Sequence, residues 1–165
     1  MSENPVGRTA IRSGDPDLVI ERTAVDVLRS IPTADGCFIA LVEGDELVCE
    51  FGLGTFAESL GLRLRIDASL AGLSLQTGTP FRCDDAETNP LVDRATARRL
   101  NVASILSAPL KDGKRPFGAL VATSSEIEAF VDPDLQTLVE TAQSLMKRLT
   151  RRKPRGLGIL SSRRR

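Results

Sequence analysis

Residues 104–125 read SILSAPLKDGKRPFGALVATSS, and this stretch decides the fold class. Two mainly apolar runs, 104–110 and 117–124, flank the polar turn KDGKR, a pattern typical of a β-hairpin. Because hairpins build antiparallel sheets and the flanking segments have helical periodicity, the predicted class is α+β.

A second hairpin is predicted from CFIALV at 37–42 and LVCEFG at 47–52, which flank a turn at Gly44-Asp45. The register set by a two-residue loop pairs Val42 with Leu47, Ala40 with Cys49, and Phe38 with Phe51. This face is apolar apart from the thiol. The other face pairs Ile39 with Glu50 and is expected to be partly solvated.

The tetrapeptide DPDL occurs at 15–18 and at 132–135, each time before an apolar stripe with helical spacing. An aspartate can cap a helix, a proline suits the first helical position, and a second aspartate favours the positive helix end. The two copies therefore predict helices at 16–31, ending before Pro32, and at 133–150. Asn89-Pro90 predicts a third helix over 91–100.

Between these helices, strands are predicted at 62–66 and 80–84, and a short helix at 69–78 that ends at Gly78. The chain of 165 residues has no histidine, the commonest general base and metal ligand. Its three cysteines lie far apart without a C-x-x-C pair, so a zinc or thioredoxin-type site is not expected, nor is any other metal site.

The charge distribution predicts three segments. Residues 151–165 carry seven Lys or Arg and no acid, so we expect a disordered arm at 1–14, one domain at 15–150 and a flexible basic tail at 151–165. The alternative for the tail is a nucleic-acid or protein contact. With no signal peptide and no long apolar run, the expected location is the cytoplasm, without membrane contact.

Three stretches, in this order and spacing, resemble the GAF domain, a small-molecule sensing and dimerisation module. They are IDASLAGLSLQTGTPFRCDD at 66–85, the hairpin at 104–125 with its Gly118, and FVDPDLQTLVETAQSL at 130–145. The resemblance implies a central antiparallel sheet with the N- and C-terminal helices on one face. On the other face it implies loops and short helices that roof a ligand pocket.

The resemblance also allows the residues that the family's usual ligands need to be compared with the residues of this chain. Haem in this family usually takes a histidine ligand, and bilin is held by a cysteine followed by a histidine, whereas Cys83 precedes Asp84. Cyclic-nucleotide members carry an Asn-Lys pair where this chain has ATSS at 122–125. Haem, bilin and cyclic nucleotides are therefore disfavoured, and no cofactor is predicted.

Short single-domain relatives of this kind include enzymes that reduce free methionine sulfoxide. That chemistry needs a thiolate in the pocket and a resolving thiol. The resemblance puts these cysteines near Ala71 and Arg98, where the chain has neither. We therefore predict no catalytic residue and no enzyme activity, and keep a divergent reductase as an alternative.

For the pocket that the resemblance implies, the first hairpin supplies the candidates Phe38, Cys49 and Phe51. The polar stretch 82–104 supplies Cys83, Asp84, Asp85, Arg94, Arg98 and Ser104. Arg82 could lower the pKa of Cys83, the two aspartates could bind a ligand or cap a turn, and the two arginines could face an anion or solvent. Cys37 and Cys49 are expected to pack as small apolar side chains.

The predicted function is a regulatory module, of the kind found in bacterial signal transduction, that binds an unidentified small molecule. We expect a homodimer through helices 16–31 and 133–150, with the signal leaving by contact with a partner because no output domain follows residue 150. The alternatives are the divergent reductase and a ligand-free interaction module with a nucleic-acid-binding tail.

Overall fold

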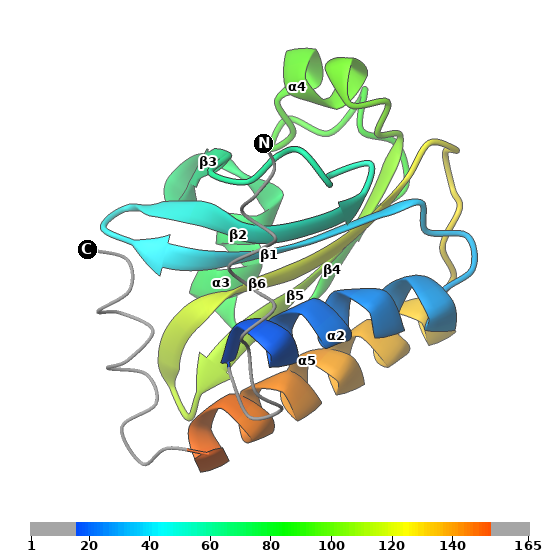
Figure 1. Cartoon of the computed structure of the whole chain (residues 1–165). Coiled ribbons are helices and arrows are strands. Elements are labelled where there is room, and N and C mark those ends of the chain that lie inside the picture. Colours follow the sequence, from blue (N-terminus) through cyan, green and yellow to red (C-terminus); the bar gives the residue numbers. More distant parts are fainter. Residues whose placement is uncertain (1–15, 153–165) are drawn as a thin grey trace.

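A curved antiparallel sheet organises residues 16–152, the part of the chain that this computed structural model describes (Figure 1). Its strands follow the order β3-β2-β1-β6-β5-β4, and every neighbouring pair is antiparallel. The strands are β1 (Gly36–Glu43), β2 (Glu46–Gly54), β3 (Arg63–Arg65), β4 (Phe81–Cys83), β5 (Ser104–Asp112) and β6 (Arg115–Ser124). The two predicted hairpins, β1–β2 and β5–β6, meet at the centre through β1 and β6, which confirms the α+β class.

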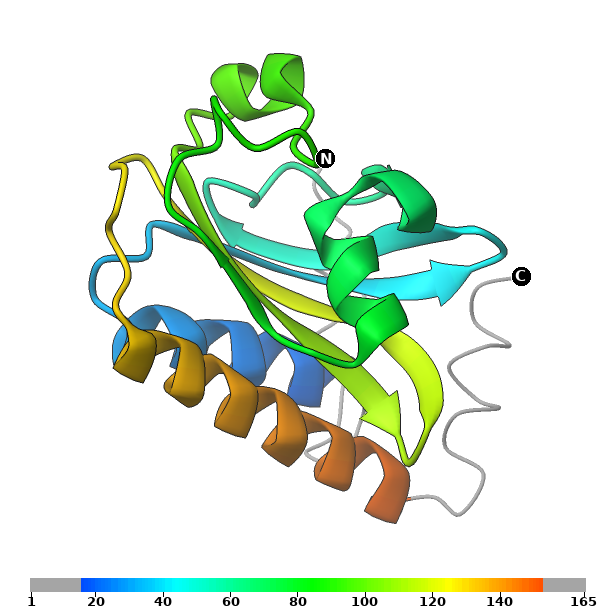
Figure 2. The ribbon, with the colours of Figure 1, turned by 180° about the vertical axis from the view of Figure 1, so that it is seen from behind.

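Two long helices cover one face of this sheet. α2 (Pro16–Ser30) and α5 (Asp132–Arg152) run alongside each other in opposite directions (Figures 1 and 2). Between them and the sheet lies the larger core, where Ile39, Leu106 and Leu120 are fully buried together with Leu138 and Leu145 of α5. Each such side chain contributes about 1.5–3 kcal/mol through burial. The predicted partly solvated face of β1 is therefore wrong, because the helices cover it.

Shorter elements cover the opposite face. They are the 3₁₀ turn η1 (Ile66–Ala68), α3 (Leu70–Thr77) and α4 (Arg94–Arg99) (Figure 2). α3 begins where Ser69 Oγ accepts from the Gly72 N–H at 3.0 Å and ends at Gly78, whose φ of 70° is left-handed. Glycine adopts this conformation without steric cost, so the predicted helix end is confirmed.

Gly118 explains how the two hairpins approach at the sheet centre. A Cβ atom built at this position would lie 2.2 Å from the carbonyl oxygen of Ala40 on β1. No side chain fits there, so the glycine permits the pairing of β6 with β1.

The helix starts follow the two DPDL copies, with one correction. At the second copy the Val131 N–H donates to Asp134 Oδ2 at 2.9 Å, so the capping carboxylate is Asp134. The carboxylate of Asp132, expected to cap, instead accepts from Arg82 Nη1 at 2.7 Å. Asp15 lies outside the described residues, and α2 ends at Ser30, before Pro32 as predicted.

The helix predicted over 91–100 is shorter than expected. Asn89 does not open it: Asn89 Oδ1 accepts from the Leu91 N–H at 2.8 Å and closes a turn instead. α4 begins only after Asp93, whose carbonyl oxygen accepts from the Ala97 N–H at 2.9 Å. As a result, 89–93 is an irregular segment that leads across the sheet face.

The first hairpin contains a β-bulge that changes the predicted register. Val42 pairs with Leu47 and Ala40 with Cys49 as predicted, but Ile39 pairs with Phe51 because Glu50 is an extra residue. The predicted pairing of Phe38 with Phe51 is therefore wrong, and Phe51 packs on the helix-covered face.

The predicted arm at 1–14 and the tail from 153 onward lie outside the described residues, and α5 continues through Arg152. Among residues 16–152, no helix combines the length and the apolar character needed to cross a bilayer.

Candidate functional site

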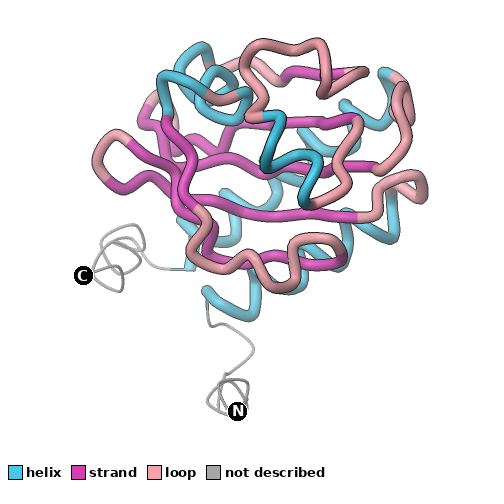
Figure 3. The backbone as a smooth tube through the Cα atoms, turned by 90° about the horizontal axis from the view of Figure 1, so that it is seen from above, coloured by secondary structure: helices cyan, strands magenta, loops and turns pink. Residues whose placement is uncertain are grey.

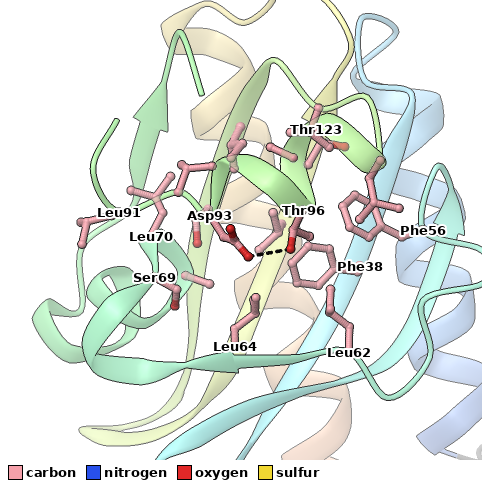
Figure 4. Close-up of a pocket in the computed structure, with 18 of the residues that line it drawn as sticks. Phe38, Phe56, Leu62, Leu64, Ser69, Leu70, Leu91, Asp93, Thr96 and Thr123 are labelled. Carbon is pink, nitrogen blue, oxygen red and sulfur yellow. Dashed lines mark hydrogen bonds between the residues drawn. The ribbon is translucent and has the colours of Figure 1, made fainter. Parts of the chain in front are cut away.

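A cavity of about 340 Å³ lies between the sheet, α3 and the segment that carries α4 (Figure 4). Figure 3 shows the backbone of these elements from above. Its floor comes from β1, β5 and β6, and its sides from β3, η1 and α3. Its roof comes from residues 91–102. The main lining side chains are Phe38, Phe56, Leu62, Leu64, Leu70, Ala71, Leu91, Val92, Ala97, Leu100, Val102, Ile105 and Val121. This size and apolar character suit a small organic molecule.

Aromatic rings shape one end of the cavity. The ring centroids of Phe38 on β1 and Phe56 after β2 lie 4.7 Å apart at 52°, and Figure 4 shows both rings beside Leu62. A tilted ring pair of this kind is a favourable aromatic contact. The pair presents a rigid apolar surface to the cavity.

Two hydroxyl groups lie in the otherwise apolar floor. Ser107 on β5 is fully buried and Thr123 on β6 is 1% exposed, and neither side-chain oxygen has a hydrogen-bond partner. Both residues line the cavity. Successive side chains of a strand point to opposite faces of the sheet. This alternation places Ser107, which pairs with Val121, and Thr123, which pairs with Ile105, on the same face.

Charged residues of the cavity lie at its rim and are already paired. Arg63 donates to Glu46 at 2.8 Å and to Glu43 at 3.1 Å, and its side chain is 51% exposed. Arg65 forms two hydrogen bonds with Asp67.

The acidic group of the rim is Asp93. The hydroxyl of Thr96 donates to Asp93 Oδ2 at 2.7 Å, a contact drawn in Figure 4, and this bond lowers the pKa of Asp93. The two arginines of the rim are therefore paired with carboxylates, Asp93 is hydrogen-bonded to a neutral hydroxyl, and the floor is uncharged.

Of the predicted site residues on the first hairpin, Phe38 lines this cavity. Cys49 lies on the same sheet face but packs beneath it, 2% exposed, with its thiol 3.6 Å from the Phe51 carbonyl oxygen. Phe51 belongs to the opposite face because of the bulge. The expectation that Cys37 and Cys49 pack as small apolar side chains is confirmed, since both are buried.

The thiols are poorly suited to nucleophilic chemistry. Burial raises the pKa of Cys49 to about 12 and also raises the pKa of Cys37. Burial likewise raises the pKa of Cys83, which contradicts the expectation that Arg82 lowers it. The guanidinium of Arg82 contacts Asp84 and Asp132 instead.

The acidic site candidates of 82–104 have structural partners outside the cavity wall. Asp84 pairs with Arg82 at 3.1 Å, and Asp85 Oδ1 accepts from the Glu87 N–H at 3.0 Å, so Asp85 takes the turn role. Ser104 donates to the Glu126 carbonyl oxygen at 2.7 Å. None of these three is among the residues that line the cavity.

The arginine pair of α4 faces away from the cavity. Arg98 donates to both carboxylate oxygens of Glu87, at 2.8 and 2.7 Å, and Arg94 donates to the Glu87 carbonyl oxygen at 3.3 Å. Both arginines are exposed. Of the two alternatives, an anion or solvent, the structure shows the solvent-exposed one, and neither pocket candidate lines the cavity.

The cavity residues that sequence reasoning missed are mostly apolar. Sequence reasoning selected polar side chains as site candidates. Leu64, Leu100 and Val121 are apolar, and their residue types do not indicate a binding site. Ser107 and Thr123 could have been identified from the sequence. Each has a hydroxyl in a predicted strand, and the alternation of side chains places it on the face opposite the long helices.

No group of three or more His, Cys, Asp or Glu side chains within residues 16–152 could hold a metal ion. The polar groups that face the cavity are hydroxyls, with ion pairs at the rim. This arrangement can hold a small molecule, and the hydroxyl–carboxylate pair among its lining residues, Thr96 and Asp93, lies at the rim.

Comparison with known proteins gives a consistent result. The family described as GAF domain matches residues 19–146, most of the chain. No curated protein matches.

Solved structures match in fold. The GAF domain of a phosphoenolpyruvate-protein phosphotransferase from Coxiella burnetii is 20% identical, with a TM-score of 0.75 over 92% of this chain and 91% of that one. A free methionine-R-sulfoxide reductase from Neisseria meningitidis, solved with its substrate, is 23% identical, with a TM-score of 0.70 over 82% and 78%. The GAF-B domain of DevS from Mycobacterium smegmatis is 21% identical, with a TM-score of 0.66 over 91% and 98%. At these identities the likeness concerns the fold.

Proposed function

The chain belongs to the GAF domain family, whose members are generally sensory and regulatory modules, and on this premise we propose that its cavity binds a small organic molecule. The observation that carries the proposal is the cavity itself, about 340 Å³ between the sheet, α3 and α4, with apolar walls and few polar groups. Apolar pockets with a few convergent polar groups are the usual form of ligand sites. The chain then reports ligand occupancy to a partner protein or to a second copy.

A short contact path supports transmission from the cavity to the long helices. Thr123 lines the cavity, and its carbonyl oxygen accepts from the Asp35 N–H at 2.9 Å. Asp35 lies between α2 and β1, and its carboxylate accepts from the Ser125 N–H at 2.9 Å, on the connection to α5. Figure 1 shows these two connections side by side at one end of the sheet. Movement of the β6 end would therefore reach both helices.

A homodimer through α2 and α5 stays a prediction. The apolar stripe of α5 that suggested it, including Leu138 and Leu149, is buried against the sheet of the same chain. A second copy would therefore meet the outer helix surfaces, where Gln136 and Glu140 of α5 are exposed. The proposed contact of 151–165 with nucleic acid also stays a prediction.

The structure gives the reductase alternative little support. Ala71, where the resemblance would put the reactive cysteine, lines the cavity, and no described thiol does. Burial raises the pKa of each cysteine, whereas the reaction needs a thiolate. We therefore favour binding over sulfoxide reduction.

Native mass spectrometry of the full chain with a metabolite extract tests the binding role. Ala97→Phe would fill the cavity from α4, where Ala97 is 7% exposed and lines the wall. Ala95→Phe is the matched control, because Ala95 is exposed on the same helix. We expect an adduct on the wild type and on Ala95→Phe that is lost from Ala97→Phe. An adduct that survives in Ala97→Phe, or its absence from the wild type, would contradict the proposal.

A further inference from the structure

The two hydroxyls in the cavity floor differ from every other buried hydroxyl of the described chain. Seven Ser or Thr side chains are buried within residues 16–152, and five of them form hydrogen bonds within the chain. The two that do not are Ser107 and Thr123, and both line the cavity. A buried hydroxyl without a partner is costly, so its concentration in one cavity points to a partner that binds there.

The two groups are neighbours on one face of the sheet. Ser107 pairs across the ladder with Val121, so Thr123 is its diagonal neighbour on the adjacent strand. Diagonal neighbours on one face have Cα atoms roughly 7–8 Å apart. Thr123 Oγ1 also lies over Gly36, where a Cβ atom would come within 2.7 Å of it. The side chains of Thr55 and Phe56 also lie close to this point, so the glycine permits tight packing around the hydroxyl.

The electrostatics of the cavity disfavour a charged ligand. The cationic groups of its wall, Arg63 and Arg65, are exposed and hydrogen-bonded to carboxylates. None of the lining residues that form the floor, on β1, β5 and β6, has a charged side chain. An ion that enters would lose its hydration without gaining a counter-charge, which is unfavourable.

We infer that the ligand is an uncharged, largely hydrocarbon or aromatic molecule with a hydroxyl, carbonyl or amide group that bonds to the hydroxyls of Ser107 and Thr123. This inference rests on the proposed binding function and adds the chemical class. A hydroxyl can donate and accept, so the pair serves either polarity of ligand group. The apolar body packs against the Phe38 and Phe56 rings.

Three naphthyl probes of matched shape test this class: 2-naphthol, naphthalene and 2-naphthoate. Their fluorescence can be followed on the full chain without background, because the protein has no Trp or Tyr. We expect 2-naphthol to bind the wild type about 3- to 10-fold more tightly than naphthalene, the gain of one net hydrogen bond. We expect 2-naphthoate to bind most weakly.

The variants Ser107→Ala and Thr123→Val remove the hydroxyls with little change of shape. In the double variant, 2-naphthol should bind no more tightly than naphthalene, while the affinity for naphthalene stays unchanged. Thr141→Val is the control, because it removes a hydroxyl from α5, where Thr141 donates to the Thr137 carbonyl oxygen at 2.8 Å. It should preserve the preference for 2-naphthol.

Each other outcome is informative. Equal binding of all three probes, or a preference that survives in the double variant, overturns the inference and leaves the binding function in place. Tightest binding by 2-naphthoate also overturns it and indicates an anionic ligand. Failure of all three probes to bind, at concentrations up to their solubility limits, counts against both the binding function and the ligand class.

Discussion

Replacement of Thr123 by valine should stabilise the ligand-free protein, although it removes a polar group from the interior. Thr123 is 1% exposed, and its buried hydroxyl has no hydrogen-bond partner in the chain. A buried, unsatisfied polar group costs about 1–3 kcal/mol, and valine has nearly the same shape. We expect the free energy of unfolding to rise by about 1–2 kcal/mol, which corresponds to an increase in Tm of roughly 2–8 °C for a domain of this size.

Urea unfolding followed by far-UV circular dichroism is the suitable assay, because the chain lacks Trp and Tyr as fluorescence probes. The protein is first refolded from denaturant to remove any retained ligand. Thr23→Val is the comparison: the Thr23 hydroxyl is also buried but donates to the Val19 carbonyl oxygen at 2.8 Å. That variant should lose about 1 kcal/mol. If Thr123→Val loses as much stability as Thr23→Val, the Thr123 hydroxyl is satisfied in the free protein and the reasoning is refuted.

Three further predictions follow from the described contacts. Gly118→Ala should lower the free energy of unfolding by at least about 2 kcal/mol in the same urea assay, because the new methyl would meet the Ala40 carbonyl oxygen. Cys49 should resist a thiol reagent in the folded protein at pH 8. Since its pKa rises from 9.0 to about 12, its contribution to the free energy of unfolding should be constant below pH 9 and fall between pH 9 and 12. Arg98→Ala should leave the affinity for 2-naphthol unchanged, because Arg98 pairs with Glu87 outside the cavity.

The order of helices and strands could be predicted because its signals are local. Gly78 ends α3 by its own backbone conformation, and Pro32 follows the end of α2. The β-bulge in the first hairpin was not predictable in this way. A two-residue turn fixes the pairs nearest to it, but the extra residue Glu50 lies further along β2 and reverses the face of Phe51.

The site was harder to predict because its residues are brought together by tertiary packing. Polar residues in 82–98 were predicted to line the pocket. In the structure, Arg82, Glu87 and Arg98 of this stretch form ion pairs at the surface. The cavity comes instead from apolar positions on several separate segments. Its two hydroxyls become distinctive only when the partners of all buried hydroxyls are known, and a sequence does not contain that information.

Methyl NMR of the full chain tests the central claim, that the cavity between the sheet and its short helices is the ligand site. With Ile, Leu and Val methyl groups labelled, 2-naphthol is added until the spectrum no longer changes. We predict chemical-shift changes at methyl groups that line the cavity, Leu64, Leu100, Ile105 and Val121. Methyl groups of the core beneath the long helices, Leu106, Leu120 and Leu138, should keep their positions. Shifts centred on that second set, or no shift in either set, would contradict the account.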